Sequence, residues 1–139
     1  MRTDRGANAG LSGGCFDPDE LRRSFDRPEV AAVYLFGSTV EGSPHPLSDV
    51  DLAYLGIDAE SEVRVFDDLY EALQRKLGEG AFDLVPLRQA PLHLQFAIAT
   101  QGTTLLVRDP IKAEGFGARA IARYLDFKPH RDQYFAIVG

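Results

Sequence analysis

One uninterrupted apolar run, Val30–Phe36 (VAAVYLF), limits the possible folds more than any other stretch of the chain. It lies between Pro28 and Gly37, and this length is typical of a strand and short for a buried helix. Its continuous apolar character is typical of a strand that is buried on both faces of a sheet. The chain is therefore expected to build a sheet with helices packed against it.

The helices are predicted from periodicity and from the residues that begin and end them. In the first helix, Asp17 is the expected N-cap, Pro18 the first helical residue and Glu20 the partner in a capping box. A long amphipathic helix is predicted over 61–77, because its apolar residues recur every three or four positions and Gly78 follows it. The apolar face of this helix consists of Val63, Phe66, Tyr70, Leu73 and Leu77.

Three further strands and two further helices complete the predicted order. The strands span about 50–56, 81–87 and 103–109, and the helices span about 90–102 and 111–127, with Pro129 ending or kinking the last one. Helices and strands alternate only in part along the chain. We therefore expect an α+β fold with a mixed sheet of about four strands, in preference to a doubly wound parallel sheet.

The size and composition of the chain limit its class. Its 139 residues correspond to one domain, in which we expect residues 1–16 to be a flexible lead-in and 17–139 to be the folded unit. Cys15 is the only cysteine, and no apolar leader or membrane-length run is present, so a cytoplasmic protein without disulfides is expected. The net charge of −6 argues against nonspecific nucleic-acid binding, and no direct contact with DNA is expected.

Two aspartates one residue apart, Asp49 and Asp51, stand at the head of the second predicted strand. Residues i and i+2 of a strand point to the same face, so the two carboxylates are expected to lie together. Both stay ionised only if a cation or several donors lie between them, and a pair of Mg²⁺ ions is suited to this. Asp83 in the third predicted strand completes a triad if that strand neighbours the second. The alternative is that these are solvated aspartates without a binding role.

A glycine–serine pair, Gly37 and Ser38, follows the first predicted strand. Glycine permits a tight turn with close backbone approach, and free N–H groups with a hydroxyl at the start of a helical turn form an anion site. Together with the aspartates, the spacing reads G-S-x3-G-x5-S-D-x-D. Phosphate-binding donors beside a carboxylate–metal site are the components of a phosphoryl or nucleotidyl transfer site.

The stretch FGSTVEGSPHPLSDVDLAYL resembles the signature of the minimal nucleotidyltransferase (MNT) domains of the DNA polymerase β superfamily. The segments FDLVPL, APLHLQFAIATQGTTLLVRDP and ARYLDFKPHRDQYF are similar to later parts of its antitoxin-type members, so that the resemblance runs from about Leu21 to Phe135. It implies a polymerase-β-like nucleotidyltransferase fold. It also implies transfer of AMP from ATP to a tyrosine of a HEPN-domain ribonuclease toxin, encoded adjacently, which silences that toxin.

The resemblance also assigns roles to individual residues. Asp49 and Asp51 would hold the Mg²⁺ ions that bridge the triphosphate, and Asp83 would help to hold the catalytic metal and accept the proton of the attacking hydroxyl. Gly37 and Ser38 would contact the β- and γ-phosphates. Ser48 would brace the loop by capping, with a phosphate contact as the alternative.

One position departs from the family pattern, which commonly has an arginine just before the second glycine. This chain has Glu41 there, and losing a cation from a triphosphate site removes roughly 1–3 kcal/mol of interaction. Two alternatives to a catalytic antitoxin stay open. One is an antitoxin that neutralises its partner by binding alone. The other is a nucleotidyltransferase for an aminoglycoside-like alcohol, which usually needs a further domain or a dimer to hold the acceptor.

Overall fold

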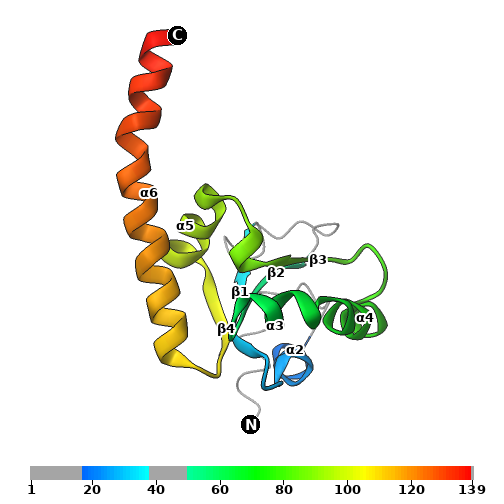
Figure 1. The fold of residues 1–139 in the computed structure, drawn as a ribbon. Helices are drawn as coiled ribbons and strands as arrows, with labels where there is room; N and C mark the ends of the chain where they lie inside the picture. Colours follow the sequence, from blue (N-terminus) through cyan, green and yellow to red (C-terminus); the bar gives the residue numbers. More distant parts are fainter. Residues whose placement is uncertain (1–16, 38–49, 139) are drawn as a thin grey trace.

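The computed structural model describes residues 17–37 and 50–138, with side chains as far as residue 127. The described part contains a four-stranded sheet in the order β3-β2-β1-β4 (Figure 1). The central strands β1 (Val30–Phe36) and β2 (Val50–Gly56) are antiparallel. At the two edges, β3 (Phe82–Pro86) runs parallel to β2 and β4 (Thr103–Val107) runs antiparallel to β1. The mixed four-stranded sheet and the α+β class predicted from the sequence are confirmed.

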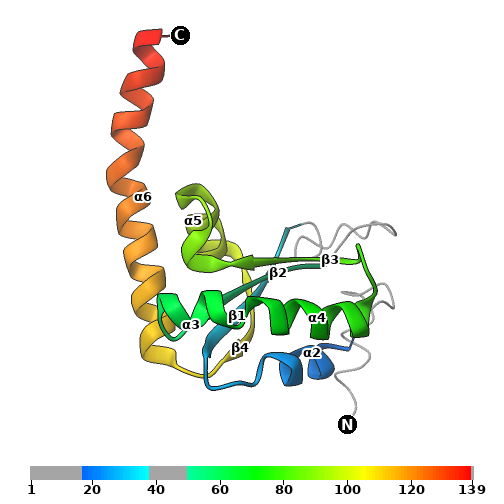
Figure 2. The same ribbon diagram turned by 45° about the vertical axis from the view of Figure 1, so that its right-hand side comes forward.

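Helices cover both faces of this sheet. Figure 2 shows α2 (Pro18–Phe25), α3 (Ala59–Arg64) and α4 (Phe66–Leu77) below the sheet and α5 (Leu92–Gln101) above it. The last helix, α6 (Pro110–Val138), packs beside α5 and extends well beyond the rest of the molecule (Figure 1). None of the helices in the described ranges is both long and apolar enough to span a membrane.

Strand alternation divides the core into two clusters. The even-numbered residues of β2, among them Leu52 and Tyr54, pack with α2 and α4. Its odd-numbered residues Ala53 and Leu55 pack with α5 and α6 on the other face. Both faces of β1 and β2 are therefore buried, which explains the continuous apolar run from which the sheet was predicted.

Several helices and strands begin or end at the residues predicted from the sequence. The Asp17 side chain caps α2 by accepting a hydrogen bond from the N–H of Asp19, so the N-cap is correct although Glu20 forms no box with it. Gly78 terminates α4 with φ 95°. Pro86 is the last residue of the edge strand β3, where the missing N–H costs no ladder hydrogen bond.

One prediction about the helices is wrong, and of the two effects predicted for Pro129, a helix end or a kink, the helix end is wrong. The helix expected over 61–77 is broken at Val65 into α3 and α4, and the break changes which residues face the core. Val63, expected on the buried face, is 58% exposed, while Val65 is buried. The last helix does not end at Pro129, because the backbone continues helical to Val138. Proline removes one N–H donor, and here the hydrogen bonds of the neighbouring turns carry the helix past it.

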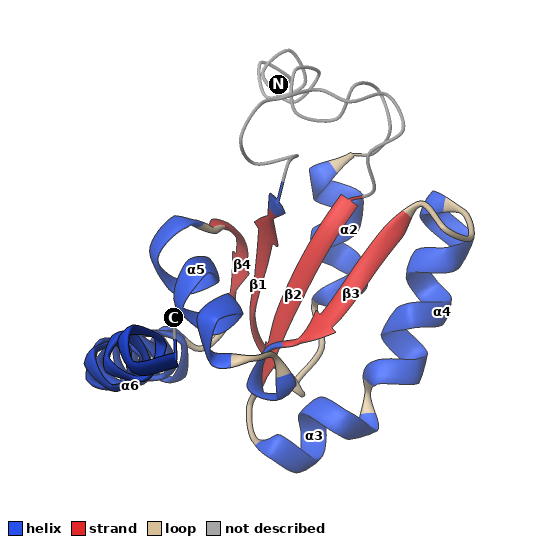
Figure 3. Ribbon diagram, turned by 90° about the horizontal axis from the view of Figure 1, so that it is seen from above, coloured by secondary structure: helices blue, strands red, loops and turns tan. Residues whose placement is uncertain are grey.

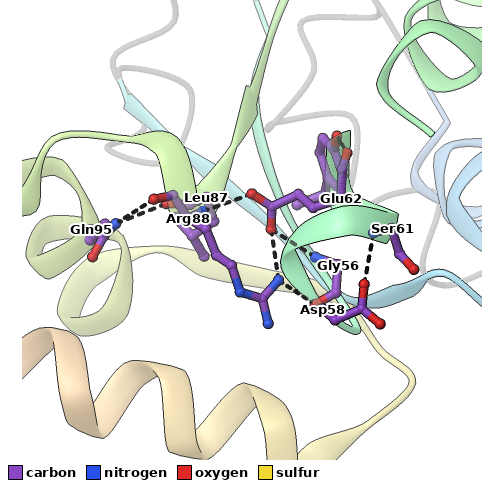
Figure 4. A network of polar contacts seen from close by, with 8 residues as sticks. Gly56, Asp58, Ser61, Glu62, Leu87, Arg88 and Gln95 are labelled. Carbon is purple, nitrogen blue, oxygen red and sulfur yellow. Dashed lines mark hydrogen bonds and ion pairs between the residues drawn. The ribbon is translucent and has the colours of Figure 1, made fainter. Parts of the chain in front are cut away.

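A buried polar network closes the end of the sheet at which β2 and β3 terminate (Figure 4). The Glu62 carboxylate is fully buried and accepts hydrogen bonds from the N–H of Gly56 at 2.9 Å, the N–H of Arg88 at 2.9 Å and Arg88 Nη1 at 3.1 Å. Arg88 Nη1 also donates to the Gly56 carbonyl at 2.7 Å. Gln95 Nε2 donates to the carbonyls of Leu87 and Arg88 in the short helix η2 (Leu87–Gln89). This network ties α3, β2, η2 and α5 together.

Candidate active site

Two of the predicted aspartates, Asp51 and Asp83, lie at the end of the sheet where the neighbouring strands β2 and β3 begin. Figure 3 shows these two strands side by side. Asp51 and Asp83 are register partners in the parallel pairing of these strands. Neighbouring strands lie about 4.8 Å apart and paired residues point to the same face, so the two carboxylates share one small region. They lie on the α5 face of the sheet, because Val50, Leu52 and Leu84 point into the opposite core. The third strand does neighbour the second, which is the condition under which Asp83 was expected to join the site.

Gly37 brings the end of β1 to the same place. Its φ of 83° lies in the left-handed region, which glycine adopts without strain. A Cβ atom at this position would lie 2.1 Å from Asp51 Oδ2, well inside van der Waals contact. The absence of a side chain at Gly37 therefore makes the room that the Asp51 carboxylate occupies.

The remaining predicted site residues, Ser38, Ser48 and Asp49, lie outside the described residues, as does Glu41. Their roles stay predictions. The expected flexible lead-in, 1–16, also lies outside the described part of the chain. The structure therefore brings together three of the predicted residues, one from each of three neighbouring strands or strand ends: Gly37, Asp51 and Asp83.

The chemistry of this region fits a hard divalent cation. Asp51 is half-buried and Asp83 is exposed, so one carboxylate is partly held in the protein and the other faces solvent. Within 17–37 and 50–138, no three acidic, histidine or cysteine side chains come together as a complete metal site. Mg²⁺ is usually held by one or two carboxylates and by substrate phosphates, and the pair that the structure describes fits this pattern.

Tyr34 also lies on the α5 face, two residues before Phe36 in β1. Burial raises the pKa of the Tyr34 hydroxyl above its ordinary value of 10.0. Its pKa therefore leaves it protonated and neutral at physiological pH, and it adds no charge near the carboxylates.

Comparison with known families agrees with this geometry. The family model described as "Polymerase beta, Nucleotidyltransferase" matches residues 20–111. This range includes β1 to β4 and the paired aspartates Asp51 and Asp83. The chain belongs to this nucleotidyltransferase family. The resemblance noted in the sequence is thereby confirmed.

Relatives of this nucleotidyltransferase are known from sequence and from structure. Protein adenylyltransferase MntA of Shewanella oneidensis is 36% identical over 78 residues, which are 56% of this chain and 55% of MntA. The matched part thus spans about half the length of that relative. A crystal structure of a toxin–antitoxin with AMP-PNP matches with 26% identity and a TM-score of 0.67, over 88% of this chain and 98% of that chain. A structure of tri-AMPylated Shewanella oneidensis HEPN toxin in complex with MNT antitoxin matches with 27% identity and a TM-score of 0.56, over 86% and 90%.

Gly37→Ala tests whether the room beside Asp51 matters to the nucleotidyltransferase. The new Cβ displaces the Asp51 carboxylate, and a displacement of about 1 Å in a reacting group can cost about a hundredfold in rate. We expect transfer to fall by about that factor, while the left-handed backbone alone costs about 1–2 kcal/mol of stability. Rates of adduct formation by mass spectrometry, with unfolding curves alongside, measure the two effects.

Gly80→Ala is the matched control for this substitution. Gly80 has φ 79°, and a Cβ there would meet nothing within 4 Å. It introduces the same backbone strain with no contact to the site, so transfer should be unchanged. Equal loss of transfer in both variants would show that strain, and not the Asp51 contact, is responsible.

The sequence did not identify two groups of residues that surround the site or support it. The first is the set of side chains that α5 places beside Gly37, which an apolar helix pattern does not distinguish from ordinary core. The second is the Glu62–Arg88 pair. A signal for Glu62 was present, because it lies four residues before Phe66 and therefore on the stripe that the helical period buries.

Proposed function

We propose that this chain is an antitoxin that transfers AMP from ATP to a tyrosine hydroxyl of a HEPN-domain ribonuclease toxin and so inactivates it. The observation that carries the proposal is the pairing of Asp51 with Asp83, on one face of the sheet and beside Gly37. Family membership supports nucleotidyl transfer. The relative named protein adenylyltransferase, and the neighbour that contains an AMPylated HEPN toxin, support the acceptor.

The reaction needs a nucleophile, a leaving group and a place for one proton. The tyrosine oxygen forms a bond to the α-phosphorus of ATP, the bond from that phosphorus to the bridging oxygen breaks, and pyrophosphate leaves. Asp83 is exposed at the edge strand, where a partner protein can reach it, and it accepts the proton of the attacking hydroxyl. Asp51 is half-buried between Gly37 and β3, which holds its carboxylate in one place.

Mg²⁺ is the cofactor that this arrangement suits. Asp51 and Asp83 would hold it, with Asp49 as the predicted third ligand. When bound, it neutralises the charge that develops on the phosphate oxygens. Gly37 and Ser38 are proposed to contact the β- and γ-phosphates, and Ser48 to brace the loop that follows.

The last helix offers a surface for the partner. Leu125 and Phe127 of α6 are 54% and 48% exposed. Phe127 also lines a pocket of about 300 Å³, together with Leu92, His93 and Tyr124. Exposed aromatic and apolar side chains that gather around a pocket are typical of protein interfaces. We infer that the HEPN protein binds here, which places it on the α5 side of the sheet, the side of the carboxylates.

The direct test combines the purified chain with the product of the neighbouring gene, ATP and Mg²⁺. We expect the partner to gain the mass of one or more adenylyl groups and to lose ribonuclease activity. Omission of Mg²⁺ should abolish both changes. If a stable complex forms and no adduct appears with any nucleotide, transfer is not the mechanism.

Glu41 favours a second candidate, in which the chain neutralises its partner by binding alone. The family commonly has an arginine at this position, and a carboxylate that faces the triphosphate there weakens phosphate binding. This candidate predicts that the partner is inhibited without nucleotide and without a change in mass. The two mechanisms are therefore separated by the same mass measurement, made with and without ATP.

A further inference from the structure

A pocket of about 220 Å³ opens between the end of β1 and the C-terminal half of α5. We call it the base pocket, and its walls include Phe36, Gly37, Leu94, Ala97, Ile98 and Gln101. Figure 3 shows α5 over the β1 side of the sheet, whereas β3 is the opposite edge strand. The pocket therefore lies on the other side of Asp51 from Asp83.

The base pocket shares a wall with the carboxylate site. Gly37 lines the pocket, and it is also the residue whose missing Cβ makes room for Asp51 Oδ2. Phe36 is the register partner of Asp51 across the antiparallel pairing of β1 and β2. Paired residues of neighbouring strands have Cβ atoms about 5 Å apart, so a ligand whose phosphates lie at Asp51 can reach the pocket with its other end.

The lining has the composition of a site for a flat, mostly apolar ring. Leu94, Ala97 and Ile98 give an aliphatic wall, and Phe36 adds an aromatic side chain of the kind on which bases stack. Among the described lining residues, Gln101 alone has a side chain that can form hydrogen bonds. Its amide both donates and accepts, and a glutamine amide pairs with the N6 amino group and N7 of adenine.

We propose that the base pocket holds the purine ring of the nucleotide and that Gln101 sets the preference for adenine. This inference rests on the proposed function and adds to it the site and the residue that select the nucleotide. It also separates the two substrates in space. The base lies on the β1 side of Asp51, and the acceptor hydroxyl lies on the β3 side, at Asp83.

Binding of two probes tests the proposal. Mg·ATP reports on base and phosphates together, whereas Mg·tripolyphosphate reports on the phosphate site alone. Ala97→Leu fills the pocket from α5, and we expect the Kd for ATP to rise at least about tenfold while the Kd for tripolyphosphate stays the same. Gln101→Leu is expected to bring the Kd values for ATP and GTP to within about twofold, from about a tenfold preference for ATP.

Ala122→Leu is the matched control, because it makes the same change at an exposed position of α6. It should leave binding of both probes unchanged. Since Gln101 is exposed, Gln101→Leu keeps the proposal testable even if Ala97→Leu fails to fold.

Three results would overturn the inference, and they differ from failure of the proposed function. If Ala97→Leu weakened the binding of ATP and of tripolyphosphate equally, the substitution would be disturbing the phosphate site. Unchanged ATP binding with slower adduct formation would assign the pocket to the acceptor tyrosine. An unchanged preference for ATP in Gln101→Leu would remove Gln101 as the reader of the base. If the unsubstituted chain bound neither probe, the proposed function itself would fail, and the base pocket with it.

Discussion

Asp51→Asn is expected to lower the rate of AMP transfer by at least about a thousandfold, because asparagine keeps the shape of the side chain and removes its charge. Asp51 is the half-buried member of the carboxylate pair, with Gly37 on one side and Asp83 on the other. A neutral amide there can no longer balance the charge of a divalent cation. The adduct on the partner, followed over time by mass spectrometry, is the measurement.

Asp67→Asn is the control for charge removal. Asp67 is exposed on α4, on the opposite face of the sheet, and its replacement changes the net charge by the same amount. Transfer should continue at the original rate in this variant. If Asp51→Asn also transferred AMP at the original rate, the carboxylate pair would not be the catalytic centre.

Asp51→Asn also separates catalysis from binding in cells. A catalytic antitoxin that carries Asp51→Asn should no longer protect cells that express the toxin, although the two proteins still associate. An antitoxin that acts by binding alone should protect as before. Folding of the variant is checked by its unfolding midpoint, which is expected to change little because the side chain keeps its volume.

Two parts of the site could be predicted from the sequence: those that follow from the alternation of side chains along one strand, and those that follow from a glycine at the end of a strand. An apolar run beside a glycine–serine pair marks the end of one strand, and alternation within the next strand places Asp51 on the face opposite Leu52. The position of Asp49 stays a prediction, because Asp49 lies outside the described residues. The pairing of Asp51 with Asp83 is different in kind. It depends on a parallel contact between strands separated by α3 and α4, and local periodicity carries no information on which strands become neighbours.

The errors have local physical reasons. A single amphipathic period over 61–77 does not reveal that the helix breaks at Val65, where Val65 is buried and Val63 is exposed. Pro129 was expected to end or kink the last helix, and the helix does not end there, since one missing donor did not outweigh the helical tendency of the turns around it. In both cases the surrounding structure overrides the preference of one residue.

Arg88→Met is expected to lower the free energy of unfolding by about 3 kcal/mol near neutral pH, since removal of one partner leaves a buried charge unpaired. The Glu62 side chain is 1% exposed and that of Arg88 is 25% exposed, and the two are joined at 3.1 Å. Methionine replaces the volume of the aliphatic stem and removes both donations of Nη1, to Glu62 and to the Gly56 carbonyl. Denaturant titration of the chain and of the variant gives the difference.

Arg64→Met is the surface counterpart of this substitution. Arg64 and Glu60 are 3.9 Å apart, with side chains 57% and 90% exposed. Ion pairs as exposed as this one contribute between about 0 and 1 kcal/mol, so this variant should unfold close to the original midpoint. A loss of stability in Arg64→Met equal to that in Arg88→Met would show that burial of the Glu62–Arg88 pair is not the cause.

The pH dependence of stability distinguishes an unpaired Glu62 charge in Arg88→Met from a simple packing defect. Burial raises the pKa of the Glu62 carboxyl above its ordinary value of 4.5, while the hydrogen bonds from Gly56 and Arg88 and the Arg88 charge oppose that rise. Without the guanidinium, the pKa of Glu62 rises further. A carboxyl with a raised pKa in the folded state contributes stability that is fully present below pH 4.5 and is lost as the pH rises through the folded pKa. Arg88→Met should therefore be less destabilising at pH 4.5 than near pH 7, whereas a packing defect would cost the same at both.

A second substitution tests whether the unpaired charge of Glu62, and not the loss of the Arg88 side chain itself, causes the destabilisation. Adding Glu62→Gln to Arg88→Met removes the buried charge that the first change leaves unpaired, so the double variant should regain part of the lost stability and lose most of its pH dependence. The network lies where β2 and β3 end (Figure 4), whereas Asp51 and Asp83 lie near the beginning of the same strands. Because the parallel register of these two strands aligns the carboxylates, transfer by the Arg88→Met variant should be normal at temperatures where it is folded and should be lost together with the fold. Loss of transfer in a fully folded Arg88→Met protein would instead mean that the pair sets the register of the strands.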